Sequence, residues 1–416
     1  MSHDTTRRLF LAGTAGAGGL ALAGCLGNGD DDDTDDDEEP TEEEDATYEI
    51  WAADQGTDEI YIYEGTEGSD EFEHLETIDV DTIGGRPHMV HYTSDYEYAA
   101  IANAGGPVIV RTEDREIVAE IETGAGSHFA GFSPDDEYLV VDVIGDNSIT
   151  RIDVDLEEEE FQIEDELIPS EEVDDISDTQ NPVCHSYDSQ GRSIHTLGPG
   201  YGDGGIVIVD HDDFEIVEAW PGEEDGFANC GTIPHPSEDK FYLTGGLPSD
   251  PDEDVDGVGE YYVLDTETDE ITKRESAGGI DTHGFWYADG GDELWVLNRE
   301  TNDGIVIDPD TDEEIETIEE FGPDTGDAPD DSDAPDIMWA SPDGEWMFVT
   351  LRGPNPVTGG PHAATGVTAG VSVLDTETKD IETVIEPNDH EDADFHGIGV
   401  RPVDDFDTDI DTSPPF

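Results

Sequence analysis

The sequence predicts an all-β domain built from seven copies of one unit. Between residues 47 and 402, apolar residues fall in short runs rich in Val, Ile, Tyr, Phe and Trp, separated by Asp-Gly, Asn and Pro turns. No run has the 3.6-residue period of an amphipathic helix. One phrase recurs seven times: a ligand-type residue, four or five mostly apolar residues, then Ser-Pro-Asp or a degraded copy. The copies begin at His88, His128, Val183, Cys230, His283, Asp336 and His396.

Each unit has room for four strands. The copies start 40 to 60 residues apart, a spacing typical of four-stranded repeats with loop insertions. In the second copy we expect strands at 129–132, 138–142 and 148–153, the first two joined by the Ser-Pro-Asp turn. Four later strands end in Asp, and a turn and a final strand follow each, which indicates a repeated hairpin. These strands end at Asp210, Asp265, Asp308 and Asp375.

The two ends of the repeat region complement each other. The copy at His396 stops after one strand. The region opens at Tyr48 with the second, third and fourth strands of a unit, and no first strand precedes them. We therefore expect the C-terminal strand to complete the N-terminal unit, which removes the open sheet edges of a linear array. Seven units is the prediction. Six or eight stay open, because segments 156–180 and 354–370 are long enough to hide or mimic strands.

The repeat resembles that of YVTN-type β-propellers. Their blades carry a Ser-Pro-Asp-Gly turn and a strand ending in Asp-Thr, and both motifs recur here, for example at Ser341 and Asp375. The resemblance covers roughly residues 47–402. It implies a seven-bladed β-propeller closed by pairing of the N- and C-terminal strands in one blade. These motifs are specific for a fold and weak indicators of function.

Acidic residues dominate the composition. There are 111 Asp and Glu against 14 Lys and Arg, for a formal net charge of −97. Such a chain repels itself in dilute buffer, whereas at molar salt the Debye length falls to about 3 Å and the repulsion is screened. The composition resembles that of proteins from extreme halophiles, and the chain as a whole resembles a haloarchaeal exported lipoprotein. Nucleic acid is excluded as a partner, because its recognition needs the opposite charge.

The N-terminus resembles a twin-arginine export signal. Arg7 and Arg8 precede a short run of Ala, Gly and Leu that ends in Leu-Ala-Gly-Cys25, which is similar to a lipobox. We expect residues 1–25 to be this signal, Cys25 to be lipidated, and the acidic segment 26–46 to be a disordered tether. Residues 47–403 would form the propeller, and 404–416 an acidic tail. The protein is thus expected on the extracellular face of the cell membrane, attached through its lipid.

One repeated position is rich in metal ligands. The first strand of each propeller blade lines the central channel, so the residues that begin the seven copies should meet in a ring. Val183 is the exception among them, and His185, two residues later on the same face of the strand, takes its place. His, Cys and Asp are ligands for zinc and copper. The predicted metal ligands are His88, His128, His185, Cys230, His283, Asp336 and His396.

Several alternatives stay open. Cys184 and Cys230 begin neighbouring inner strands and could form a disulfide, which would remove Cys230 from the ligand set. The register places Cys184 one residue beyond the ring position, so its side chain is expected to leave the channel, although both outcomes are open. The histidines at this position could instead only cap loops by hydrogen bonding, without any metal.

The function has more than one interpretation. The His-rich channel resembles those of nitrous oxide reductase and the selenium-binding-protein family, which hold copper. Nitrous oxide reductase also needs a cupredoxin-like domain, and this sequence lacks one. Exported propellers that bind zinc and pass it to an importer are similar in size and location, which implies a metal transporter or another surface protein as partner. The alternatives are a non-enzymatic scaffold for a protein or glycan, a copper-dependent oxidoreductase, and a lactonase. The sequence contains no Gly-x-Ser-x-Gly elbow, phosphate loop or dinucleotide fingerprint.

Overall fold

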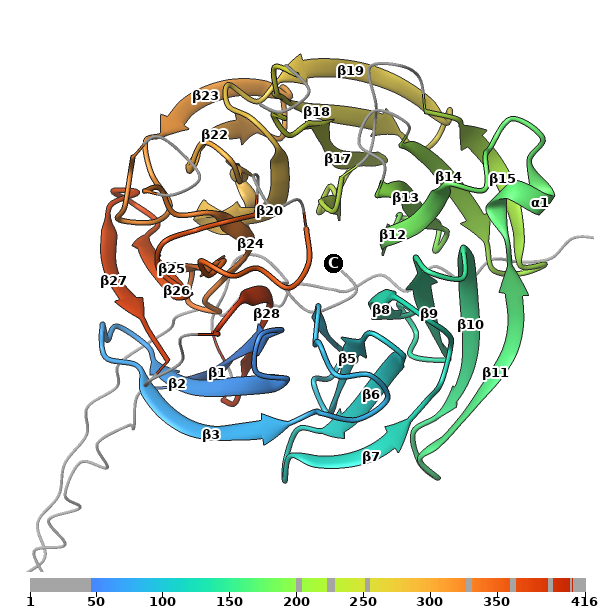
Figure 1. The fold of residues 1–416 in the computed structure, drawn as a ribbon, viewed down its shortest axis with the longest axis horizontal. Coiled ribbons are helices and arrows are strands. Elements are labelled where there is room, and N and C mark those ends of the chain that lie inside the picture. The colour runs from blue at the N-terminus through green and yellow to red at the C-terminus, as the bar shows by residue number, and fades with distance from the viewer. Residues whose placement is uncertain are drawn as a thin grey trace, which may run out of the picture. The chain divides into compact units, whose positions relative to one another are not determined.

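Seven four-stranded antiparallel sheets form a ring around a central axis (Figure 1). The computed structural model describes residues 46–199, 204–222, 229–250, 255–326, 331–359, 364–387, 392–404 and 406. The chain divides into Met1–Glu44 and Asp45–Phe416, and every described residue belongs to the second unit. Cys25, the predicted signal 1–25, the tether except Ala46, and the tail except Asp404 and Phe406 lie outside the described residues.

The strands of each sheet follow one another along the chain, except in the sheet that joins the two ends. The sheets are β28 (Phe395–Pro402), β1 (Thr47–Asp54), β2 (Glu59–Thr66) and β3 (Glu73–Asp79); β4 (Val90–Tyr92), β5 (Tyr98–Asn103), β6 (Gly106–Arg111) and β7 (Glu116–Glu120); β8 (Ser127–Phe132), β9 (Tyr138–Val143), β10 (Ser148–Asp155) and β11 (Glu160–Leu167); β12 (Gln180–Tyr187), β13 (Ser193–Pro199), β14 (Gly205–Asp210) and β15 (Glu215–Trp220); β16 (Thr232–Pro234), β17 (Lys240–Leu247), β18 (Val258–Asp265) and β19 (Glu270–Ser276); β20 (Thr282–Ala288), β21 (Glu293–Asn298), β22 (Asp303–Asp308) and β23 (Glu313–Ile318); β24 (Pro335–Ala340), β25 (Trp346–Leu351), β26 (Gly370–Asp375) and β27 (Ile381–Ile385).

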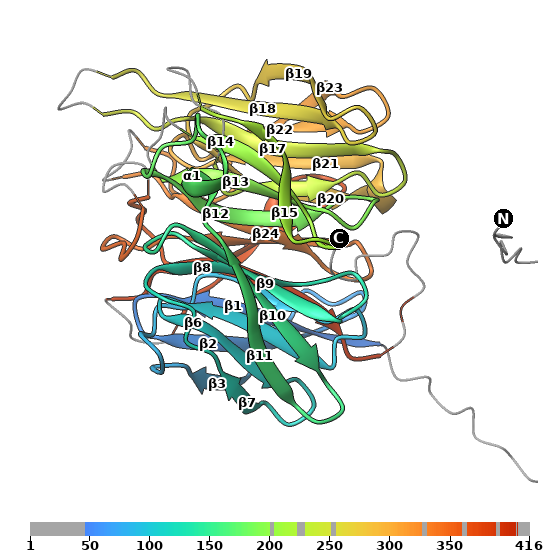
Figure 2. The ribbon, with the colours of Figure 1, turned by 90° about the vertical axis from the view of Figure 1, so that its right-hand side faces the viewer.

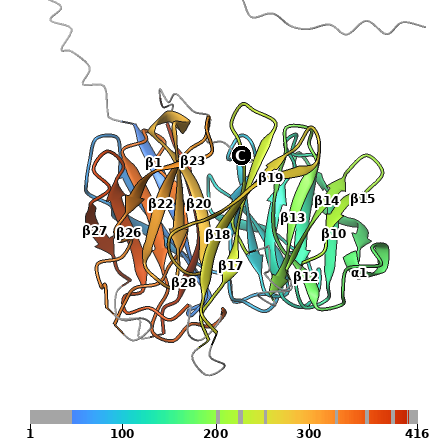
Figure 3. The same ribbon diagram turned by 90° about the horizontal axis from the view of Figure 1, so that it is seen from above.

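This arrangement confirms the predicted seven-bladed β-propeller. Each sheet is a blade whose first-named strand lies near the axis and whose last lies at the rim (Figure 1). Seen edge-on, the strands run across the thickness of the ring (Figures 2 and 3). Among the described residues, the segments that left six or eight blades open add no blade: 156–180 holds β11, the short helix α1 (Pro169–Glu172) and the first residue of β12. A 3₁₀ turn, η1 (Asp289–Gly291), is the other helical element among the described residues.

The ring closes through β28, as predicted. This strand pairs antiparallel with β1, with Tyr48 opposite Pro402 and Ala52 opposite Ile398. Beyond the ladder, the Asp404 carboxylate accepts hydrogen bonds from the backbone N–H and the hydroxyl of Thr47, both at 3.0 Å. The first blade therefore has its inner strand from one end of the repeat region and its outer three from the other, and this blade has four strands like the other six.

The Ser-Pro-Asp phrase is a turn with a fixed set of hydrogen bonds. In the blade β8–β11 the Ser133 hydroxyl donates to Asp135 at 2.8 Å and accepts the backbone N–H of Tyr138 at 3.1 Å. Asp136, in the middle, has a φ of 57°. The side chains replace backbone bonds that a tight turn cannot make, which is why the phrase recurs where the first strand of a blade meets the second.

Apolar side chains fill the space between neighbouring blades. The inner and middle strands are almost fully buried, whereas the outermost strands, such as β7 and β23, are exposed along much of their length. Trp51 and Trp295 are the largest fully buried side chains of this core. No helix among the described residues has the length and apolar character needed to span a membrane.

Candidate metal centre

The inner strands bring most of the predicted ligands to one cavity. It has a volume of about 290 Å³ and is lined by five of the seven predicted residues, namely His88, His128, Cys230, His283 and His396. The imidazole centroids of His88 and His128 are 4.7 Å apart, those of His128 and His396 5.3 Å, and those of His283 and His396 6.1 Å. Residues from five blades thus converge as the repeat predicted.

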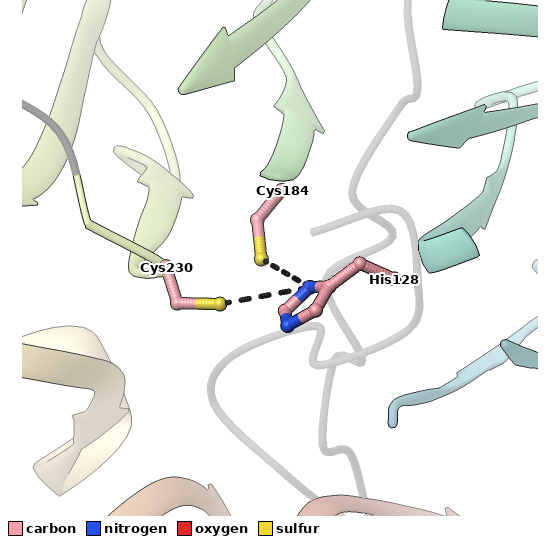
Figure 4. A group of neighbouring side chains, drawn as sticks. All are labelled: His128, Cys184 and Cys230. Atoms are coloured by element: carbon pink, nitrogen blue, oxygen red, sulfur yellow. Dashed lines mark hydrogen bonds between the residues drawn. The ribbon is translucent and has the colours of Figure 1, made fainter. Parts of the chain in front are cut away.

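At the channel, one group of ligand atoms that lie close together consists of His128 and two cysteines (Figure 4). The Nδ1 atom of His128 lies 3.5 Å from the Cys184 sulfur and 4.0 Å from the Cys230 sulfur. A metal bound tetrahedrally with Zn–S and Zn–N bonds of ordinary length separates its S and N ligands by about 3.6 Å. The two measured distances bracket this value, so the three side chains already have the spacing of a Cys₂His site.

Cys184 belongs to this group because the register of β12 shifts. The pairing of β12 with β13 is irregular between Pro182 and His185, and such a bulge reverses which side chains face the channel. Cys184 therefore turns towards His128, and the expectation that it leaves the channel was wrong. Both cysteines are free thiols in this structure.

The same bulge removes His185 from the channel. Its side chain is fully buried, and its Nδ1 atom lies 2.6 Å from the Asp142 carboxylate. The prediction that His185 points into the channel with the other ring residues is therefore wrong. The physical reason is the extra residue in β12, which breaks the alternation of side chains on which the prediction depended.

The two thiols differ in acidity. Burial raises the pKa of the Cys184 thiol, and its neighbour Cys230 raises it further. Burial also opposes ionisation of Cys230, but the hydrogen bond from Cys184 and the charge of His128 outweigh it and lower the pKa of Cys230 to about 6. Correspondingly, although burial opposes the charged form of His128, Cys230 raises the pKa of this imidazole. The pair therefore provides a thiolate, the form that binds metals, at neutral pH.

The other three histidines of the cavity are neutral. Burial lowers the pKa of His88 and His396 well below the usual value and that of His283 to about 3, and neighbouring histidines and arginines add to the effect. Their Nδ1 atoms are buried and have no hydrogen-bond partner among the described residues. Neutral imidazoles with unpaired nitrogens are suited to accept a metal ion.

Asp336 has a different environment from the other predicted ligands. Its carboxylate lies 3.1 Å from the Arg299 guanidinium and 2.8 Å from that of Arg352. Arg299 also pairs with Asp281 at 2.8 Å, and Arg352 with Asp394 at 2.6 Å. Asp336 is therefore the centre of a buried chain of alternating charges beside the cavity. Its oxygens are engaged by two cations, and this arrangement favours a structural role over a place among the metal ligands.

Sequence reasoning missed the two arginines of this chain. Arg299 directly follows β21 and Arg352 directly follows β25, so they occupy the same position in neighbouring blades and both line the cavity. Aligned arginines in a chain with only 14 basic residues are a signal that could have been found.

A second, smaller cavity lies on the other side of the cysteines. Its volume is about 70 Å³, and its walls include Met89, Phe129, Trp286 and Trp339. The two indoles stack with their centroids 4.1 Å apart. Cys184 lines this cavity, and Cys230 lines both cavities. The thiols therefore stand between a polar, histidine-lined part of the channel and an apolar part.

Comparisons with known proteins support the fold alone. No family model and no curated protein matches the chain. Among the solved structures that match, the Dos1 propeller superposes with a TM-score of 0.54 at 14% sequence identity, and the match covers 82% of each chain. At this identity the likeness establishes a β-propeller and carries no information on the cavity residues.

Proposed function

We propose that this protein binds a transition metal, zinc or copper, in the channel of its propeller and takes part in metal handling at the cell surface. The observation that carries the proposal is the convergence of His128, Cys184 and Cys230 at distances suited to one ion. Two thiolates and an imidazole suit zinc and also copper(I), because both accept soft sulfur ligands.

Three protein ligands leave a place for a fourth. In zinc proteins a Cys₂His set with one open position exchanges ligands readily, unlike a closed Cys₄ set. His88, His283 and His396 line the polar cavity, and their Nδ1 atoms have no hydrogen-bond partner among the described residues. They offer an incoming or departing ion a succession of weaker ligands, which is the arrangement a metal carrier needs. The remaining expectations about location, export in a folded state and lipidation at Cys25 complete the proposal.

A metal measurement tests the proposal directly. The full chain is produced in strong salt under reducing conditions, exposed to zinc or copper(I), freed of excess metal, and analysed by elemental mass spectrometry. The test variants are Cys230→Ser and the double variant His128→Ala with His283→Ala. His74→Ala is the matched control, because His74 is an exposed histidine on β3, outside the channel. We expect tightly bound metal in the wild type and the control and a loss of about one equivalent in both test variants. Equal metal in all proteins would overturn the proposal and favour a scaffold for a protein or glycan.

A copper-dependent oxidoreductase is the second candidate. The apolar cavity beside the thiols favours it, because a small apolar substrate could approach a bound ion there while water is excluded. Oxygen consumption by the copper-loaded protein with small thiols as substrates, compared with its zinc-loaded form, separates the two functions.

A further inference from the structure

The polar cavity differs in charge from the rest of the molecule. Asp and Glu make up 111 of the 416 residues of the chain, yet neither type occurs among the described residues that line this cavity. Three arginines line it, namely Arg86, Arg299 and Arg352, although Lys and Arg together number only 14 in the chain. In a protein whose net charge repels anions, a cavity with guanidiniums in its wall is suited to attract one.

Two of these arginines are already balanced by carboxylates. The guanidiniums of Arg299 and Arg352 are buried and pair with Asp281, Asp336 and Asp394. None of these three carboxylates is part of the described cavity wall. Arg299 and Arg352 thus keep acidic groups away from the cavity, but the charge that binds an anion has to come from the third arginine.

The charge of Arg86 is not balanced. Every other Lys and Arg in the described part of the chain forms an ion pair with Asp or Glu. Arg86 forms none with a described residue, although its own backbone N–H donates to the Asp58 carboxylate at 2.6 Å. Its side chain is exposed and lines the cavity. In so acidic a chain, an arginine without a carboxylate partner is available for an anionic ligand.

The backbone holds Arg86 at the cavity in an unfavourable conformation. Its φ is 56°, in the left-handed region that favours glycine, whereas a residue that precedes a proline, here Pro87, favours an extended conformation. The neighbouring Gly85 is fixed, because its carbonyl accepts the backbone N–H of Ala104 at 2.8 Å. Strained positions of this kind occur preferentially at binding sites, where the surrounding structure maintains them.

A carboxylate is the anion that this guanidinium fits. The planar fork of N–H groups matches the two oxygens of a carboxylate, a geometry that a chloride ion does not offer. This selectivity is needed in the strong salt that the composition favours, where chloride competes. The cavity volume of about 290 Å³ equals the space of roughly ten water molecules, so a small organic acid fits beside a metal ion.

We propose that the polar cavity binds a small dicarboxylate, with one carboxylate on Arg86 and the other in the open position of the ion held by His128, Cys184 and Cys230. The contact with Arg86 does not need the metal, whereas the contact with the ion rests on the proposed function. A carboxylate oxygen is an ordinary zinc ligand, so the dicarboxylate completes a four-coordinate site. The cargo of the channel is then a complex of the metal with a small organic acid.

Succinate is the probe for this site. Its binding to the full chain is measured by isothermal titration calorimetry in strong potassium chloride under reducing conditions. Metal-free protein and protein loaded with zinc and freed of excess zinc are titrated separately. Arg86→Gln removes the guanidinium, and Arg86→Lys keeps the charge without the fork. Arg274→Gln is the matched control, because Arg274 is an exposed arginine on β19 that does not line the cavity.

We expect succinate to bind the metal-free wild type and Arg274→Gln with equal affinity, and the zinc-loaded wild type more tightly. Arg86→Gln should weaken binding at least about tenfold, because it removes hydrogen bonds between charged groups. Arg86→Lys should have a smaller effect. Equal affinities of the wild type and Arg86→Gln overturn the proposal, as does a wild type that binds no succinate.

The two proposals fail separately. If the wild type takes up no zinc, the proposed function fails, and titration of the metal-free protein still decides whether Arg86 binds the anion. If zinc is bound and leaves the affinity for succinate unchanged, the contact between the dicarboxylate and the ion is overturned. Circular dichroism and the unfolding midpoint check that the Arg86 variants are folded, as we expect for changes at an exposed side chain.

Discussion

The Nδ1 atom of His128 lies 3.5 Å from the sulfur of Cys184, which belongs to the next blade. This contact depends on the bulge in β12, without which Cys184 would face the opposite side of its strand. The same nitrogen lies 3.1 Å from the Val183 carbonyl, to which it donates when it carries a proton. Binding of a metal at Nδ1 would replace that proton and remove the hydrogen bond to the Val183 carbonyl.

The acidity of Cys230 gives a pH-dependent prediction. Its pKa is lowered to about 6 because the hydrogen bond from Cys184 and the charge of His128 outweigh the effect of burial. Thiolate absorbance of the reduced, metal-free protein should therefore increase as pH rises through about 6. In His128→Gln the favourable charge is lost, and the midpoint should move to higher pH. A wild-type midpoint at the ordinary value for cysteine would contradict this account, and Cys230→Ser identifies the thiol responsible.

The metal affinity of the channel should follow the same titration. Protons compete with the metal for the thiolate, so affinity is full above the pKa of Cys230 and falls as pH decreases below about 6. Competition with a chromophoric chelator at a series of pH values measures this. Affinity that is constant between pH 5 and pH 8 would show that the thiolates are not ligands.

Loss of the Asp336 carboxylate should destabilise the fold. Asp336→Asn leaves the buried Arg299 and Arg352 with one anionic partner each, and breaking such a buried ion pair costs about 3–5 kcal/mol. Chemical unfolding in strong salt measures the change. Asp70→Asn is the control, because Asp70 is exposed, and it should leave the unfolding midpoint unchanged. An equally small effect at Asp336 would show that the charge chain contributes nothing.

The pH dependence of stability at Asp336 has a defined sign. Burial opposes ionisation, but the neighbouring imidazoles and guanidiniums outweigh it and hold the pKa of Asp336 well below its usual range. The guanidiniums act at neutral pH, where the cavity imidazoles are uncharged. Because the folded-state pKa is lowered, the contribution is complete above the unfolded-state value of about 3.9 and is lost as pH falls below it. The stability difference between wild type and Asp336→Asn should therefore be constant near neutrality and shrink in acid.

Gly397 tests the packing at the closure of the ring. A Cβ atom at this position would lie 2.7 Å from the Cα atom of Met89 and even closer to the His88 carbonyl oxygen. Because both contacts are with backbone, Gly397→Ala should cost about 1–3 kcal/mol. Gly68→Ala meets no neighbouring atom and bears only the strain of its positive φ, so it should be the milder change in a thermal unfolding experiment. The reverse order would show that β28 does not pack against β4 as described.

Oxidation should compete with metal binding. The Cys184 and Cys230 sulfurs both lie beside the Nδ1 atom of His128, so a small disulfide reagent can oxidise them to a disulfide, with the reagent reduced to two thiols. We expect this product, two mass units lighter than the dithiol, in the metal-free protein and much less of it after loading with zinc. Oxidation at equal rates with and without zinc would indicate that the ion does not bind the thiols.

The fold was predictable from the sequence because its signals are local and repeated. The Ser133–Asp135 turn and the strands ending in Asp recur in blade after blade, and the unmatched strands at Tyr48 and His396 revealed the closure. The convergence of side chains at the channel was predictable for the same reason. Each blade places a residue at or just before the start of its first strand near the axis, so alignment of the copies predicted that His88, His128, Cys230, His283 and His396 would meet.

The errors arose where the inner strands depart from strict alternation of side chains. Cys184 and His185 exchanged their expected directions because the pairing of β12 is irregular between Pro182 and His185. The inner strands β8, β20, β24 and β28 have a similar irregularity near their start, so the period of two was the wrong guide at this position. The pairing of Asp336 with Arg299 and Arg352 was invisible for another reason. It joins residues from different blades, and their separation in sequence carries no information about contact.

The closing strand also determines when the channel can first exist. His396 lies on β28, the last strand of the described chain, whereas its partner strand β1 is the first. During synthesis the chain emerges from the ribosome with six blades complete and the N-terminal blade lacking its inner strand. The cavity acquires its final wall only after translation has passed residue 402, so an ion can be enclosed there only in the finished chain.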